Sequence, residues 1–249
     1  MSDTTSSLPE PTPTPEDPNY PGLMASVIGV ITSPGETFKH VARTPKVSGA
    51  LFIVCLATAL AQGLPQFTES GRAAALDMQV EQMETFGMTV TDEVYAEMEA
   101  RSKTNVSGYI TLVTTFLLVP FVSVIFTAIF WAIFNAILGG TASFKHVMAV
   151  VVHSQVVTTL SLLVAAPIMY ARGQMSAGGI ANLGALVPLD EGTFLAHFFG
   201  LIDLFIVWWV VVLAIGLATL YRRSTTGVAT GLFITYAVIA VSFAYFLAG

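Results

Sequence analysis

The chain has 249 residues, of which 54% are hydrophobic and only 10% are Asp, Glu, Lys or Arg. A soluble domain carries roughly 25% charged residues because its surface faces water, so this composition excludes an ordinary soluble protein and predicts a surface that mostly faces lipid. The net charge of −6 argues against a nucleic-acid partner, which requires a dense Lys/Arg surface, and the single cysteine, Cys55, excludes a disulfide framework or thiolate metal site within one chain.

The first 20 residues form a Pro/Thr-rich tail. They contain five prolines, several Ser and Thr residues, and no Lys or Arg. Such a segment cannot bury enough apolar area to offset the entropy of ordering, so we expect residues 1–20 to be a disordered cytoplasmic tail. It also lacks the basic start and apolar core of a signal peptide. Residues 21–249 are then expected to form one membrane domain.

The segment Pro21–Thr44 is a distinct element between the tail and the first apolar run. Its residues 33–36 (SPGE) read as a capping box with proline at the first helical position, so a helix should begin there. That helix would place Phe38 and Val41 on one side and cations elsewhere. Two arrangements remain open. The helix either lies in the cytoplasmic interface with its cations toward anionic headgroups, or packs on the helical bundle.

Five apolar runs are long enough to cross a bilayer, where only helices satisfy their own backbone. They are Val47–Leu64, Tyr109–Leu138, Val147–Tyr170, Phe198–Tyr221 and Gly227–Ala248. The second run exceeds one span and requires tilt, an exposed end or a bend, for which Pro120 is the expected place. The predicted fold class is therefore all-α, a polytopic membrane protein with five transmembrane helices.

Basic residues gather before the first run and in the two short connections between later runs. These expected interfacial anchors are Lys39, Arg43, Lys46, Lys145, Arg222 and Arg223. The positive-inside rule places them in the cytoplasm together with the N-terminus, and places the C-terminus outside. A bacterial-type plasma membrane is the expected location.

The loop of residues 65–107 has the opposite character, with eight acidic residues against three basic ones. It is expected outside the cytoplasm, folded into two short helices over residues 72–86 and 91–100, with Gly87 between them. Because it is the only sizeable soluble feature, an extracytoplasmic partner should meet the protein there.

One short pattern occurs twice. Residues 37–41 (TFKHV) are matched by residues 143–147 (SFKHV), each shortly before an outward-running span. Internal repeats are common in membrane folds. Duplication and a shared need for a basic anchor at the inner interface explain this pattern equally well.

Several segments resemble a known family. Residues 33–45 (SPGETFKHVARTP), followed at once by a span, look like the opening of the Yip (Ypt-interacting protein) domain. Residues 139–145 (GGTASFK) are similar to its short inner turn, and residues 202–217 (IDLFIVWWVVVLAIGL) to its fourth helix. The likeness covers about residues 20–247 and rests on order, spacing and the five-span layout. It implies a five-helix membrane domain with a cytoplasmic N-terminus.

The resemblance also carries an expectation about partners. Eukaryotic relatives of this family bind small prenylated GTPases and act in vesicle traffic. The Asp-Leu-Tyr-Gly-Pro motif typical of those members is absent from residues 1–20. The chain looks more like the prokaryotic members of the family.

Ionisable residues inside a membrane are costly, so they are candidates for function. Two fall within the predicted spans, Asp203 in the fourth and His153 in the third. We expect Asp203 to pair with Arg172 and His197 near the outer surface. The remaining candidates lie near His153 in the inner half of the membrane and are Gln155 and Asn135. This set is either a proton or ion pathway, or a group of interhelical hydrogen bonds that hold the bundle.

Gly227 and Gly231 form a GxxxG pattern at the start of the fifth run, which permits close helix approach within the chain or in a homodimer. No hydrolase, nucleotide-binding or metalloenzyme motif is present, so we predict no catalytic residue, cofactor or metal. The predicted function is interaction, as a scaffold, assembly factor or accessory subunit, with the lipid bilayer and a membrane protein or second copy as partners. The alternative is a small transporter or channel that uses Asp203 and His153.

Overall fold

The computed structural model describes residues 22–172, 181–185, 187, 189–190 and 192–248. The predicted tail, residues 1–20, lies outside the described residues. Helices make up the regular structure of the described part, which contains no β-strand beyond one isolated antiparallel bridge between Asn182 and Asp203. The all-α fold class is therefore confirmed.

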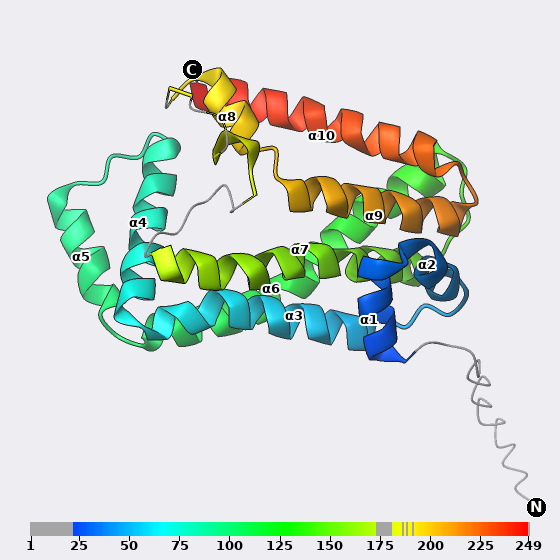
Figure 1. The fold of residues 1–249 in the computed structure, drawn as a ribbon, viewed down its shortest axis with the longest axis horizontal. Helices are drawn as coiled ribbons and strands as arrows, with labels where there is room; N and C mark the ends of the chain where they lie inside the picture. The colour runs from blue at the N-terminus through cyan, green and yellow to red at the C-terminus, as the bar shows by residue number, and fades with distance from the viewer. Residues whose placement is uncertain (1–21, 173–180, 186, 188, 191, 249) are drawn as a thin grey trace, which may run out of the picture.

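Five of the described helical segments are apolar and long enough to cross a membrane, as predicted, and neighbours in sequence run in opposite directions (Figure 1). They are α3 with η1 (Ser48–Gly63 and Leu64–Phe67), α6 with η2 (Val106–Trp131 and Ala132–Ile137), α7 (Phe144–Arg172), α9 (Leu204–Tyr221) and α10 (Thr225–Ala248). Helix α7 is central. It packs on α3, α6 and α9, and 61% of its most apolar 18-residue stretch is buried. Helix α10 is peripheral. It packs mainly on α9 and α8, and only 11% of its most apolar 18-residue stretch is buried.

The long second span shows no break at Pro120, where a bend was one of the expectations. Helix α6 continues through this proline and crosses behind α7 at a slant (Figure 1). Its departure from α-helical geometry comes later, in η2, which is a stretch of π-helix. The tilt accounts for the excess length, because a tilted helix needs more residues to cross the same thickness.

The fourth span begins later than predicted. Helix α8 (Phe194–Gly200) ends before residues 201–203, where the backbone leaves the helix, and α9 begins at Leu204. The predicted boundary at Phe198 is therefore wrong, since the first residues of that run belong to α8, which packs on α10. Hydropathy alone joins two helices that the backbone separates.

Two short helices precede the first span and lie across one end of the bundle (Figure 1). They are α1 (Leu23–Thr32) and α2 (Pro34–Arg43). Phe38 and Val41 of α2 are fully buried, and α2 packs on α9 and α7. Of the two arrangements left open by the sequence, packing on the bundle is therefore the one observed for the apolar side of this helix.

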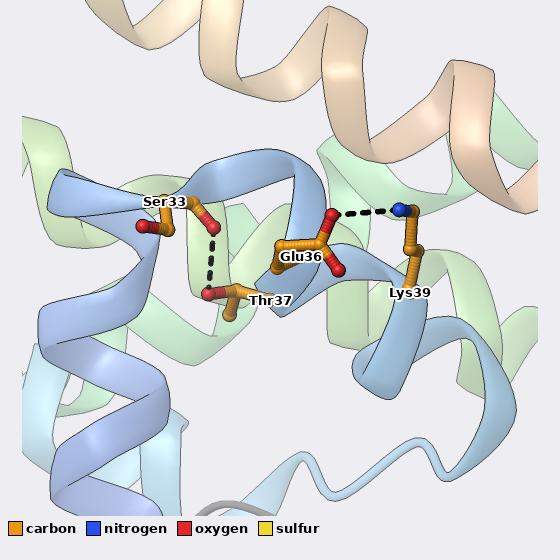
Figure 2. A network of polar contacts seen from close by, with 4 residues as sticks. All are labelled: Ser33, Glu36, Thr37 and Lys39. Atoms are coloured by element: carbon orange, nitrogen blue, oxygen red, sulfur yellow. Dashed lines mark hydrogen bonds and ion pairs between the residues drawn. The ribbon is translucent and has the colours of Figure 1, made fainter.

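Helix α2 begins at Pro34 as predicted, but the capping box does not form. The Ser33 side chain makes no cap hydrogen bond. Instead, the Thr37 hydroxyl donates to the Ser33 carbonyl oxygen (3.0 Å), and the Glu36 carboxylate accepts from the Lys39 ammonium (2.7 Å), as Figure 2 shows. Glu36 thus turns toward a cation of its own helix rather than back to the helix start.

The loop of residues 65–107 folds into the two predicted helices at the opposite end of the bundle from α1 and α2 (Figure 1). They are α4 (Glu69–Thr85) and α5 (Asp92–Ser102). Each is capped by a threonine, Thr68 or Thr91, whose hydroxyl accepts from the backbone amide three residues later, so the chain itself defines both starts. Gly87 between them has φ 76°, a left-handed conformation that favours glycine.

The packing of α2 gives a test. A Cβ added at Gly216 of α9 would lie 2.6 Å from Val150 Cγ1 and 2.9 Å from Phe38 Cε1. We expect Gly216→Ala to lower the stability of the detergent-purified protein by about 1–3 kcal/mol, because the overpacked contact displaces α2. The matched control is Gly231→Ala in α10, where a Cβ meets nothing within 4 Å. Equal melting temperatures for the two variants would contradict this packing.

Candidate functional site

The two ends of the bundle carry opposite charge. At one end lie α2, the connection from η2 to α7 and the turn from α9 to α10 (Figure 1). All six predicted anchors are exposed there: Lys39, Arg43, Lys46, Lys145, Arg222 and Arg223. Glu36 is the one carboxylate at this end among the described residues. We call this the basic end, and the end that carries α4, α5 and α8 the acidic end.

The cations of the basic end differ in what they contact. The Lys39 hydrogen bond and charge lower the pKa of the Glu36 carboxyl below its ordinary value, so this carboxyl is ionised at neutral pH. The Arg223 guanidinium donates to the Leu138 carbonyl oxygen (2.5 Å) and joins the two short connections. Three further cations have no hydrogen-bond or ion-pair partner among the described residues: Arg43, Lys145 and Arg222. These three can bind an external anion without breaking a contact within the described chain.

Gln155 and Asn135 join neighbouring helices. The Gln155 Oε1 atom accepts from the hydroxyl of Ser123 in α6 (2.9 Å). Asn135 Nδ2 donates to the Ala142 carbonyl oxygen just before α7 (2.7 Å), and Asn135 Oδ1 accepts from the Tyr221 hydroxyl at the end of α9 (2.8 Å). A further hydrogen bond, between the Thr58 and Thr159 hydroxyls (3.3 Å), links α3 to α7. Bonds of this kind hold membrane bundles together.

His153 has a different arrangement. Its side chain is 1% exposed, and its Nδ1 atom lies 2.7 Å from the carbonyl oxygen of Ala149, one turn earlier in α7. Because a carbonyl only accepts, Nδ1 carries the hydrogen. The bond stays within one helix and involves neither Gln155 nor Asn135, so the structure does not join these three residues in one network.

Asp203 caps a helix. Its Oδ1 atom accepts from the amides of Phe205 (2.7 Å) and Ile206 (3.2 Å), the first free donors of α9. Asp203 therefore does not lie inside a helical span, as the sequence predicted, but directly before the first residue of α9. A carboxylate is favoured at a helix N-terminus by the exposed amides and the helix dipole. This occupation of the carboxylate favours a structural role over an ion pathway.

The predicted ion pair between Arg172 and Asp203 is not tested, because the side chain of Arg172 lies outside the described residues. The observed neighbours of Asp203 are backbone groups that the sequence does not indicate. Leu183 N–H donates to the Ile202 carbonyl (2.9 Å), and Leu204 N–H donates to the Ala181 carbonyl (3.1 Å). The Tyr236 hydroxyl of α10 donates to the Leu201 carbonyl. These contacts satisfy a stretch of non-helical backbone, as a membrane requires.

Gly227 and Gly231 do not mediate close packing within the described chain. Both are exposed on α10, and a Cβ at Gly231 meets nothing within 4 Å, while one at Gly227 meets only Ser224 of its own helix turn. Of the two expectations for this pair, close approach to another described helix is therefore wrong. Contact with a second chain remains a prediction.

The described residues also contain no group of three or more His, Cys, Asp or Glu side chains that could hold a metal ion. Cys55, the single cysteine, is buried in α3. The polar groups with defined geometry are thus the interhelical bonds, the Asp203 cap and the two charged ends.

A comparison with models of protein families matches residues 28–247 to the Yip1 domain. The chain belongs to the Yip1 domain family. The match begins inside α1 and includes all five spans and both charged ends. Neither the curated proteins nor the solved structures give a match. Family membership and the five apolar helices together identify this Yip1-family chain as an integral, multi-pass membrane protein.

Two substitutions at one position test the role of Asp203 in this Yip1-family protein. Asparagine is as good a helix cap as aspartate, whereas alanine cannot cap. We expect Asp203→Ala to lower stability by about 1 kcal/mol and Asp203→Asn to leave it nearly unchanged, as measured by thermal unfolding in detergent. If Asp203→Asn were as destabilising as Asp203→Ala, the negative charge and not the cap would be what the fold requires.

Proposed function

We propose that this Yip1-family protein works by interaction, as a scaffold, assembly factor or accessory subunit of a membrane complex, and that the α4–α5 hairpin binds the partner. The observation that carries the proposal is the poor packing of α5. None of its residues is buried, and it contacts α4 and only a small part of α6. A helix with so little support from the described part of its own chain is well placed to pack on another protein.

The energetics of α5 support this proposal. It has 11 residues, and isolated helices shorter than about 12–15 residues are marginal in water. At the end of α5, the charge pairs Arg101–Glu97 (2.5 Å) and Lys103–Glu99 (3.3 Å) are exposed and contribute only a few tenths of a kcal/mol each. Packing on a partner would add the burial that α5 does not obtain from the bundle.

The exposed residues of the hairpin indicate the chemistry of that partner. Phe86 and Met88 are exposed at its tip, and Val94 and Tyr95 are exposed on α5. Carboxylates accompany them on α5, at Asp92, Glu93 and Glu97. Aromatic and methionine side chains are enriched in interfaces, and charge complementarity steers association. The partner surface we infer is apolar with a basic rim.

Photo-crosslinking tests this proposal. A photoreactive phenylalanine analogue at Tyr95 should give one discrete covalent adduct in intact cells, and the mass of the adduct distinguishes a second copy from another protein. The control is the same analogue at Tyr245 of α10, which is more exposed but lies outside the hairpin. Glu93→Lys with Glu97→Lys should abolish the Tyr95 adduct. The proposal fails if Tyr95 gives no discrete adduct, or only the products seen at Tyr245.

We further propose that the basic end faces the cytoplasm and the acidic end the outside, from the positive-inside rule applied to the six exposed cations. In a Cys55→Ala background, Glu93→Cys should react with a membrane-impermeant maleimide in intact cells. Lys145→Cys should react only after permeabilisation. The reverse pattern would place the basic end outside.

A further inference from the structure

Helix α1 is an apolar helix with an apolar face that the described residues leave uncovered. It carries no charged residue along its 10 residues. One side is buried against the bundle through Ser26 and Val30. The opposite side is open, with Met24 62% and Ile28 53% exposed. In water this open face would be unfavourable, so it requires an apolar surrounding.

The direction of α1 indicates which surrounding is available. Figure 1 shows that α1 lies across the direction of the five spans, at the basic end. A helix in this orientation at the end of a membrane bundle runs parallel to the membrane plane. Helices with one apolar face bury it about 5–10 Å deep, at the boundary between headgroups and acyl chains.

The charge around α1 points to the same surrounding. Its first residue, Leu23, approaches the start of α3 so closely that a Cβ at Gly49 would lie 2.8 Å from the Leu23 side chain. Lys46 comes three residues before Gly49, and α2, which follows α1 directly, carries Lys39 and Arg43. The basic end as a whole carries six exposed cations against the single carboxylate of Glu36 among the described residues. An apolar face beside a cationic surface complements a leaflet that contains anionic lipid.

We propose that α1 is inserted in the lipid leaflet at the basic end, and that the exposed cations of that end bind the headgroups of anionic phospholipids in the same leaflet. From the sequence, an interfacial position is one of two expectations for the helix that starts at Pro34. The structure does not allow α2 to insert, because its apolar side chains Phe38 and Val41 are already buried in the bundle. Helix α1 inserts, and α2 contributes the charge.

The two helices are coupled, so lipid binding and the fold depend on each other. Gly29 of α1 crosses α2 at Thr37, whose hydroxyl takes the place that a larger residue at position 29 would need. The same threonine hydroxyl donates to the Ser33 carbonyl between the helices (3.0 Å; Figure 2). Phe38 of α2 packs on α9 beside Gly216 and so attaches the pair of helices α1 and α2 to the bundle. These contacts through α2 therefore hold α1 at a fixed position relative to the spans.

The depth of α1 is tested by fluorescence quenching in nanodiscs of phosphatidylcholine and phosphatidylglycerol. In the Cys55→Ala background, Ile28→Cys and the matched control Glu36→Cys are labelled with the same fluorophore. We expect spin-labelled phospholipid to quench position 28 and aqueous iodide to quench position 36. The proposal would be overturned if iodide quenched the label at position 28 as strongly as the label at position 36, since α1 would then face water. Quenching by neither would overturn it as well, since a protein would cover α1.

The anionic lipid is tested by native mass spectrometry of protein released from an equimolar mixture of the two phospholipids. Wild-type protein should retain phosphatidylglycerol preferentially. Arg43→Gln with Arg222→Gln should reduce that retention at least threefold. The matched control removes two cations at the acidic end, Arg101→Gln with Lys103→Gln, and should retain as much as wild type. Equal retention by the two double variants would overturn lipid binding at the basic end. Neither measurement depends on whether α4 and α5 bind a partner.

Discussion

The structure depends on one constraint: hydrocarbon offers no hydrogen-bond partner, so every backbone polar group at membrane depth must be satisfied by the protein. The five spans meet it with helical backbone, and their hydroxyls mostly donate to carbonyls one turn earlier, as Thr127 does in α6 and Ser154 does in α7. Where the backbone leaves the helix at residues 201–203, the segment at residues 181–183, Tyr236 and the carboxylate of Asp203 satisfy it. The charges that cannot be satisfied in this way lie at the two ends.

Because of this constraint, the polar side chains of the interior and those of the two ends have different roles. The polar side chains between helices each join one pair of neighbours, such as Ser123 with Gln155 and Thr58 with Thr159, around the central helix α7. They account for the bundle as a structure. The ends carry helices that do not cross the membrane, α1 with α2 and α4 with α5, and these present opposite charge and exposed apolar side chains to their surroundings. This difference between interior and ends supports the proposal that the protein works by interaction through its ends.

Much of this fold could be predicted from the sequence, because hydropathy and capping residues act locally. The five spans, the start of α2 at Pro34 and the threonine-capped helices α4 and α5 follow from such signals. The start of the fourth span does not follow from hydropathy, because the last residues of α8, Phe198 to Gly200, are apolar and precede the span almost directly. The available signal is Asp203, an N-cap residue directly before an apolar run. Helix α1 escapes prediction because it is apolar yet too short to cross.

Other features depend on tertiary packing and could not be read from one sequence. The repeated pattern shows this: Phe38 is 0% exposed, while Phe144, its counterpart, is 40% exposed. The two copies share a buried valine, Val41 and Val147, and cations at the same end, but only one phenylalanine faces α9 across Gly216. Similarly, the GxxxG pattern predicts close approach, yet whether α10 has a neighbour on that face depends on where the other helices lie.

The measurement that tests the account most directly is hydrogen–deuterium exchange of the protein in nanodiscs, followed by mass spectrometry. If the interior polar groups are structural and dry, the α7 amides around His153 and Gln155 should be among the slowest to exchange. The amides of α5, which has no buried residue, should exchange quickly until a partner binds. Rapid exchange along the middle of α7 would indicate a water-filled pathway through these residues, and would contradict the proposal that this protein acts through its ends.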